Sequence, residues 1–215
     1  MLYKIINSGS DGNCTILEGK VAIDMGVSYK SINSYIKNLQ LVLLTHIHSD
    51  HFNKSTIKRL AKERPTLRFG CCKWLVEHLI ELGVNRRNID VYNFGEGIFY
   101  NRNLSIEVFE LFHDVPNCGY KVFINNKKVV YATDTNTLGE LEAKDFDLYL
   151  IEGNYENKEE LRERAESDYY YDRVIKTHLS REYTTEWLLN NMSDSSEFHF
   201  MHEHRDRSKN EDKKK

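Results

Sequence analysis

Three histidines and an aspartate stand close together directly after a short apolar run at residues 41–44. The segment reads Thr45-His46-Ile47-His48-Ser49-Asp50-His51. Imidazole and carboxylate groups without a thiolate favour a borderline-hard divalent cation such as zinc or manganese. A histidine-rich surface is the alternative, but it has no reason to follow a buried strand in this order. The stretch therefore predicts a metal site at the end of a buried strand.

The spacing inside this motif indicates two ions. His46 and His48 are two residues apart, so on an extended backbone their side chains point the same way and can share one ion. Asp50 and His51 come after the turn begins, where a tightly curled backbone can face them toward a second ion a few Å away. Hydrolysis is the natural use of such a pair.

The motif His46-x-His48-x-Asp50-His51 after an apolar strand resembles the signature of the metallo-β-lactamase fold superfamily of metal-dependent hydrolases. It is most similar to the small exonuclease-like branch of Gram-positive bacteria and their phages. The resemblance covers roughly residues 8–202. It implies an α/β fold, an αββα sandwich of two mixed sheets flanked by helices, which we expect to form a single domain over residues 1–204.

By order and position, the resemblance implies further metal ligands at the ends of apolar strands. His113 would join His46 and His48 on the first ion, and Asp134 would bridge the two ions. Asp50 and His51 would hold the second ion together with Asp134 and a last ligand from the final strand. That last ligand is expected to be His202, with His204 as the alternative.

The resemblance also implies roles for two residues outside the ligand set. Asp24 resembles the aspartate that lies under the metal loop and steadies its histidines, although the N-cap of a following helix remains an alternative. His178 lies in a His-Leu-Ser element similar to one in the nuclease-like branch, where this histidine is thought to help the leaving group; Thr177 replaces the glycine of that pattern. Asp50 and His178 are the candidate catalytic residues. His78 is expected to be a surface or packed histidine.

Composition and net charge limit how such a protein can contact a polyanion such as nucleic acid. The chain has 215 residues, 40% of them hydrophobic, and a formal net charge of -3. No global basic field draws it onto nucleic acid, so a polyanion must meet a local patch. Residues 205–215 contain no apolar side chain, and we expect a charged, disordered tail.

Localisation is predicted from the cysteines and the apolar runs. The four cysteines form no C-x-x-C pair and two of them are adjacent, which predicts reduced thiols. The N-terminus does not resemble a signal peptide, and no apolar run reaches 18 residues. We therefore expect a cytoplasmic protein that does not meet a membrane.

Periodicity and turn residues predict the elements of the sandwich. Strands are expected at 2–6, 14–18, 21–24, 41–44, 67–71, 89–94, 97–100, 104–112, 120–125, 129–133, 147–152 and 197–204. Helices are expected at 28–39, 53–64, 73–82, 156–166 and 181–191. The tyrosine-rich stretch 167–172 is expected to be a loop, which either packs over the sandwich edge or walls the substrate.

The constellation fits a hydrolase with two Zn²⁺ or Mn²⁺ ions, which lower the pKa of a shared water and supply hydroxide at neutral pH. Phosphodiester hydrolysis is favoured, with nucleic-acid ends or small nucleotides as substrates. Two alternatives stay open, a thioester or lactone hydrolase of the same fold and a non-catalytic ligand-binding protein. The sequence leaves the substrate itself and the oligomeric state undetermined.

Overall fold

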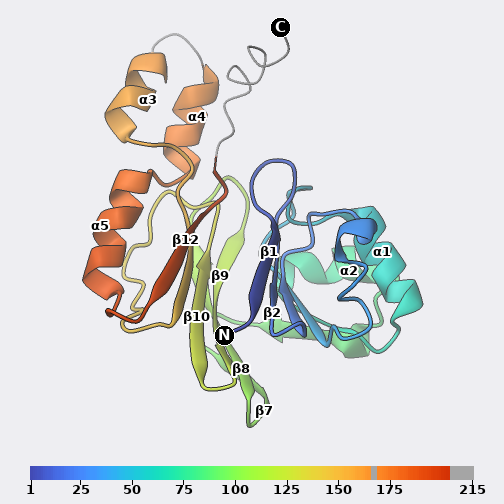
Figure 1. The fold of residues 1–215 in the computed structure, drawn as a ribbon. Coiled ribbons are helices and arrows are strands. Elements are labelled where there is room, and N and C mark those ends of the chain that lie inside the picture. The colour runs from blue at the N-terminus through green and yellow to red at the C-terminus, as the bar shows by residue number, and fades with distance from the viewer. Residues whose placement is uncertain (166–168, 204–215) are drawn as a thin grey trace, which may run out of the picture.

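Two β-sheets pack face to face and carry helices on both outer faces (Figure 1). The computed structural model describes residues 1–165 and 169–203. Helices α1 and α2 cover the outer face of one sheet and α5 covers the outer face of the other. The expected αββα sandwich of two mixed sheets is therefore confirmed.

The first sheet is built by the first half of the chain in the order β1-β2-β3-β4-β5-β6. Its strands β1, β2 and β3 pair antiparallel, and β3 to β6 pair parallel. The strands are Tyr3–Asn7 (β1), Cys14–Leu17 (β2), Val21–Ile23 (β3), Leu41–Leu44 (β4), Arg68–Cys72 (β5) and Ile89–Tyr92 (β6).

The second sheet has the order β12-β11-β10-β9-β8-β7. Here β7 to β10 pair antiparallel, while β10, β11 and β12 pair parallel. The strands are Gly97–Asn101 (β7), Leu104–Leu111 (β8), Asn117–Ile124 (β9), Lys127–Ala132 (β10), Leu148–Glu152 (β11) and Glu197–Met201 (β12). The expected turn at Asn125-Asn126 joins β9 to β10, and both residues have positive φ.

The central strands are apolar throughout because each of their faces meets a different core. In β4, Val42 and Leu44 pack toward the helices, whereas Leu41 and Leu43 pack toward the second sheet. Side chains alternate between the two faces of a strand, so a strand covered on both sides needs a continuous apolar run. Such a strand can place polar side chains only where it ends, which is where the histidine motif begins.

The structure has five α-helices in its described part, and four of them, all but α4, lie in segments predicted to be helical. They are Lys54–Glu63 (α1), Val76–Glu81 (α2), Lys158–Ala165 (α3), Tyr169–Thr177 (α4) and Arg181–Asn191 (α5). The Asn53 side chain caps α1 by accepting a hydrogen bond from Thr56 N, as its position before the helix predicts. The segment expected as one helix over 73–82 opens with a 3₁₀ turn, Lys73–Leu75, before α2.

The helix predicted over residues 28–39 is wrong. The segment holds a 3₁₀ turn, Tyr29–Ile32, followed by further turns. Ile32, Ile36 and Leu39 are buried, so the helical spacing identified the inward face correctly. Asn33 and Asn38 lie between them, and asparagine side chains compete for backbone hydrogen bonds and favour turns over helix.

The prediction of a loop over 167–172 is wrong from Tyr169 onward, where α4 begins. Residues 167 and 168 lie outside the described part. The stretch from Tyr169 to Thr177 contains no glycine or proline that would end a helix, and Val174 on its inner side is buried. Helices α3 and α4 lie side by side above the sandwich (Figure 1).

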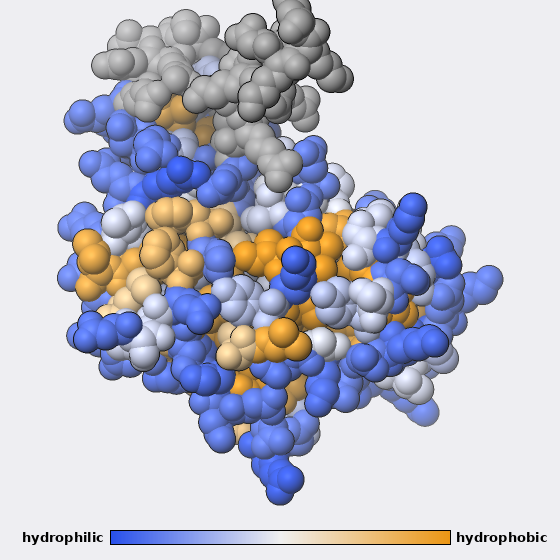
Figure 2. All heavy atoms as spheres, in the orientation of Figure 1, coloured by the Kyte–Doolittle hydropathy of each residue, from blue (hydrophilic) through white to orange (hydrophobic). Residues whose placement is uncertain are grey.

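The surface of the molecule, its cysteines and its helices were compared with the sequence-based expectations. Figure 2 shows hydrophilic residues around the rim of one face and hydrophobic residues in its middle, over the edge where β1 and β12 lie. All four cysteines are buried free thiols, as predicted. In the described part of the chain, no helix has the length and apolar character needed to span a membrane. His204 and the predicted tail, 205–215, lie outside the described residues.

Candidate metal centre

The predicted ligands gather at one end of the sandwich because each follows the end of a strand. The histidine motif follows β4, His113 follows β8, Asp134 follows β10 and His202 follows β12. Asp134 and His202 both have positive φ, 57° and 52°, so the backbone turns sharply at each of them. His202 is thus placed by this turn, one residue after β12 ends at Met201.

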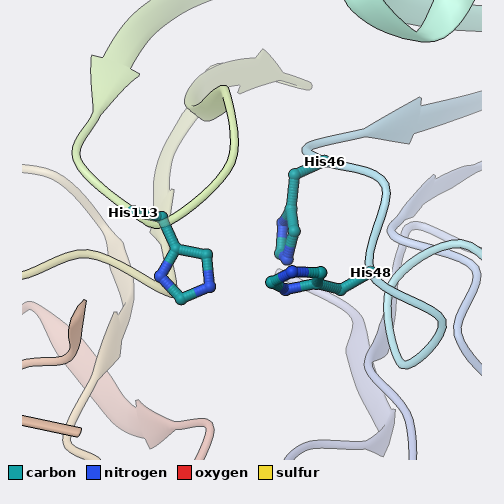
Figure 3. A group of neighbouring side chains, drawn as sticks. All are labelled: His46, His48 and His113. Carbon is teal, nitrogen blue, oxygen red and sulfur yellow. The ribbon is translucent and has the colours of Figure 1, made fainter. Parts of the chain in front are cut away.

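Three of the histidines form the first group of donors. His46, His48 and His113 each offer a ring nitrogen, and these nitrogens lie within 4.8 Å of one another. Figure 3 shows the three rings converging on a common point. This separation is compatible with three ligands of one ion, because metal–nitrogen bonds to zinc are about 2.0–2.1 Å long.

Asp50, His51 and His202 form the second group, again with donor atoms within 4.8 Å of one another. Asp50 Oδ2 lies 3.2 Å from His202 Nε2 and 3.6 Å from His51 Nε2. His51 and His202 come from opposite sheets, so this group joins the two halves of the sandwich.

Asp134 lies between the two groups. Its Oδ2 atom is 2.9 Å from His51 Nε2. Its Oδ1 atom is 3.4 Å from His202 Nε2 and 3.8 Å from His113 Nε2. The carboxylate therefore touches donors of both groups, and it is almost fully buried between them.

Asp24 lies beneath the motif and is fully buried. Its Oδ1 accepts hydrogen bonds from the backbone N and the Oγ1 of Thr45, at 3.0 and 2.9 Å. Its Oδ2 accepts from His51 Nδ1 at 2.7 Å and from Tyr131 Oη at 2.9 Å. The 3₁₀ turn that follows is capped by Ser28, so Asp24 steadies the motif and is not an N-cap.

The hydrogen bonds on the far side of each ring determine which nitrogen faces the centre. His51 donates from Nδ1 to Asp24, and His113 Nδ1 lies 3.1 Å from the Thr177 carbonyl oxygen. His46 Nδ1 lies 3.0 Å from Thr45 Oγ1, which itself donates to Asp24. Each ring thus uses Nδ1 outward and keeps Nε2 for the centre, as metal-ligating histidines commonly do.

A buried ring nitrogen without a partner indicates that a cation belongs here. His46 Nε2 has no hydrogen-bond partner, and Asp134 Oδ2 meets only the ring of another candidate ligand, His51, at 2.9 Å. An unsatisfied buried polar atom costs about 1–3 kcal/mol, so such atoms need a ligand. Burial also lowers the pKa of His46 well below its usual value, which keeps its ring neutral and its lone pair available.

The second group attracts positive charge even more strongly. Burial alone would lower the pKa of His51, but the Asp134 and Asp24 carboxylates raise it to about 10. Without an ion, this ring therefore holds a proton that a metal ion has to displace. The donor set fits divalent cations in both groups.

Glu152, at the end of β11, belongs to the site although the sequence reading missed it. Its buried carboxylate accepts hydrogen bonds from His178 Nδ1 at 2.6 Å, Thr135 N at 3.0 Å and Leu179 N at 3.2 Å. Its position at the end of an apolar strand is the same signal that pointed to Asp134. The His178 ring is held against that of His202, stacked at 5.2 Å between centroids.

Three further residues lie near the donors or were considered for the site, namely Asn154, Thr177 and His78. Asn154 was not predicted from the sequence; its Nδ2 donates to the His202 carbonyl oxygen at 2.8 Å. Thr177, the departure from the glycine of the pattern, is the last residue of α4 and its carbonyl meets His113. The His78 side chain is 44% exposed and lies 3.8 Å from Glu81, at the surface as expected.

A pocket of about 170 Å³ opens over the two groups of donors. Its wall includes His48, Asp50, His113, Asp134, His178 and His202, together with residues of α4 and the loop after β1. A small anionic group can therefore reach both groups of donors and His178 from solvent.

Sequence comparison places the chain among known proteins. The profile described as the Beta-lactamase superfamily domain matches residues 28–198. Exodeoxyribonuclease WalJ of Streptococcus pneumoniae is 29% identical over 181 residues, covering 72% of this chain and 62% of that protein. Exodeoxyribonuclease YycJ of Bacillus anthracis is 28% identical over 149 residues, covering 62% of this chain and 54% of that protein. The chain thus matches less than two thirds of the length of these relatives.

Solved structures share the fold at low sequence identity. The metallo-beta-lactamase fold protein YhfI of Bacillus subtilis superposes with a TM-score of 0.72 at 15% identity, covering 98% of this chain and 89% of that one. The short form of human tRNase Z superposes with a TM-score of 0.69 at 13% identity, covering 94% and 93%.

Proposed function

Because the chain belongs to the metallo-β-lactamase superfamily, we propose that it is a metal-dependent phosphodiesterase or nuclease acting on nucleic-acid ends or small nucleotides. The observation that carries the proposal is the meeting of two donor groups at the Asp134 carboxylate. The names of the relatives WalJ and YycJ, both exodeoxyribonucleases, support it.

We assign the donors to two ions, either zinc or manganese. His46, His48 and His113 would hold the first ion, and Asp50, His51 and His202 the second, with Asp134 shared by both. When bound, such a pair lowers the pKa of a shared water and stabilises charge on the phosphoryl oxygens.

The chain's own groups would orient the reactants and move the protons. Asp50 lines the pocket with a partly exposed carboxylate and would orient the attacking water. His178 would donate a proton to the leaving oxygen, as a general acid. Glu152, hydrogen-bonded to His178 Nδ1, would fix the ring so that its other nitrogen serves the substrate.

We also propose where the protein works and what it binds. Four buried free thiols support a reducing cytoplasm as the place of work. Nucleic acid or a nucleotide would be the partner, met as substrate. We further propose that residues 1–204 act as one domain.

A substrate panel tests the proposal. Bis(p-nitrophenyl) phosphate, labelled single-stranded DNA and RNA, cyclic dinucleotides, a thioester and a lactone would be assayed with zinc and with manganese. We expect turnover of phosphodiesters. Turnover of the thioester or lactone alone would point to the other hydrolases of this fold, and no turnover with metal bound would favour a ligand-binding protein.

A second assay tests the role of His178. An alkoxide leaving group needs a proton donor, whereas p-nitrophenolate leaves without one. His178→Ala should therefore lose much more activity on an unactivated nucleotide than on the nitrophenyl ester. An equal proportional loss on both substrates would show that His178 is not the general acid.

A further inference from the structure

Arg173 stands at the wall of the metal-centre pocket. It lies on α4, and its guanidinium Nη2 donates to Asp114 Oδ2 at 2.9 Å. Its side chain is 53% exposed, so it faces solvent as well as the pocket. Of the described residues that line this pocket, it alone is a lysine or arginine.

Asp114 connects Arg173 to the first donor group. Its Oδ1 lies 3.3 Å from His48 Nε2 and 3.1 Å from His113 Nε2. One carboxylate thus separates the guanidinium from two of the predicted ligands. Glu203, which also lines the pocket, is paired with Arg181 at 2.8 Å, so it does not compete for Arg173.

Resting on the proposed function, we propose that Arg173 binds a second phosphate of the substrate, next to the scissile one. The scissile group must lie at the donors, and Asp114 stands between these donors and the guanidinium. A strand carries one phosphate per nucleotide, so the phosphate next to the scissile one is a single nucleotide away. A neighbouring phosphate is therefore the group that falls within reach of Arg173.

The chemistry of the side chain suits this role. Guanidinium presents five N–H donors in a planar fork that matches phosphate oxygens. The bond to Asp114 uses one of its nitrogens and holds the side chain beside the pocket, which leaves further N–H groups for a ligand. Arg173 is thus a substrate-binding residue that favours chains with at least two phosphates over isolated diesters.

Two matched substrates test this inference. Thymidine dinucleotide has one phosphate, whereas its 5′- and 3′-phosphorylated forms each carry a second one. For the unaltered protein we expect a KM at least tenfold lower for one phosphorylated form than for the dinucleotide. In Arg173→Met this ratio should fall to about one, and Arg173→Lys should recover only part of it because lysine lacks the fork.

Arg59→Met is the matched control, because Arg59 is an exposed arginine paired with Glu63 on α1, outside the pocket. It should leave the KM ratio at the unaltered value. Thermal unfolding of both variants checks that α4 and α1 remain folded. Equilibrium binding gives a second readout: thymidine 3′,5′-bisphosphate should bind the metal-loaded protein more tightly than either monophosphate, and Arg173→Met should remove the difference.

The outcomes separate this inference from the proposed function. Hydrolysis of thymidine dinucleotide with no preference for either phosphorylated form would overturn the role of Arg173 and leave the phosphodiesterase intact. A preference that survives in Arg173→Met would overturn it as well. Failure of the unaltered, metal-loaded protein to cleave any of the three substrates would instead count against the proposed function.

Discussion

His51 Nδ1 donates a hydrogen bond to Asp24 Oδ2 at 2.7 Å, and neither side chain is exposed to solvent. The bond joins the histidine motif to β3 and directs the opposite ring nitrogen, Nε2, toward Asp134. Partners of this kind orient metal ligands and raise their basicity. The same carboxylate also accepts hydrogen bonds from Thr45, the first residue of the motif. Asp24 therefore positions both the first residue of the motif and its last histidine, His51.

Asp24→Asn should therefore weaken metal binding without changing any ligand. Each of the two carboxylate oxygens of Asp24 accepts two hydrogen bonds. In asparagine, an NH₂ group would replace one of these oxygens and would point at two hydrogen-bond donors. We expect a loss of about 10–100-fold in metal affinity and of about 1–3 kcal/mol in unfolding free energy. Chelator competition and denaturant titration measure the two effects. Asp194→Asn, at an exposed position, should change neither; unaltered affinity in Asp24→Asn would contradict the role given to Asp24.

Gly26→Ala should disrupt the motif through the backbone. A Cβ at this position would lie 1.6 Å from the Asp50 carbonyl oxygen, so the segment 48–51 would have to move. We expect a marked fall in melting temperature and loss of metal binding together. Gly97→Ala is the control, since a Cβ there meets nothing closer than 3.5 Å. Similar melting temperatures for the two variants would show that the close packing of Gly26 against the Asp50 carbonyl is not needed for stability.

Stability should decrease as the pH rises above about 8.5, the usual thiol pKa. Burial raises the pKa of Cys71 to about 12. Between these values, the unfolded chain loses the thiol proton and the folded chain keeps it, so unfolding becomes easier by up to about 1.4 kcal/mol per pH unit for each such thiol. Denaturant titrations at pH 8, 9 and 10 measure the slope. Cys71→Ala should make it shallower, and an unchanged slope would contradict this assignment.

Glu152→Gln and His178→Ala should act on the same step. Because Glu152 is hydrogen-bonded to His178 Nδ1 at 2.6 Å, either change removes the oriented proton donor. In a double-mutant cycle on an unactivated nucleotide, we expect the double variant to lose no more activity than His178→Ala alone. Additive losses would mean that Glu152 acts on the reaction independently of His178.

The sequence was most informative wherever a strand had to end. Continuous apolar runs such as 41–44 predict strands covered on both faces, and the polar residue after each run predicts the edge at which ligands meet. His46, His113 and Asp134 were found in this way, with the family resemblance supplying their order. The donor groups now lie together as that reading requires, while their assignment to ions remains a prediction.

Glu152, helix α4 and Arg173 were not predicted from the sequence, for physical reasons. Glu152 follows the same rule as Asp134, but an acid at a strand end is common, and its partner His178 lies 26 residues further along the chain. The tyrosine-rich stretch became α4 because packing of its inner side overrides the weak helix propensity of aromatic residues. Arg173, which α4 brings to the pocket, could therefore not be recognised before the helix was seen.

In the mechanism proposed above, two ions joined by Asp134 act together on a phosphodiester. The most direct test is the rate of bis(p-nitrophenyl) phosphate hydrolysis as manganese is added stepwise to the metal-free protein, with bound metal measured in the same samples. We predict that activity rises until about two equivalents are bound and then stays constant. Full activity at one equivalent would show that a single ion suffices, and no activity with two equivalents bound would show that the pair does not act on phosphodiesters.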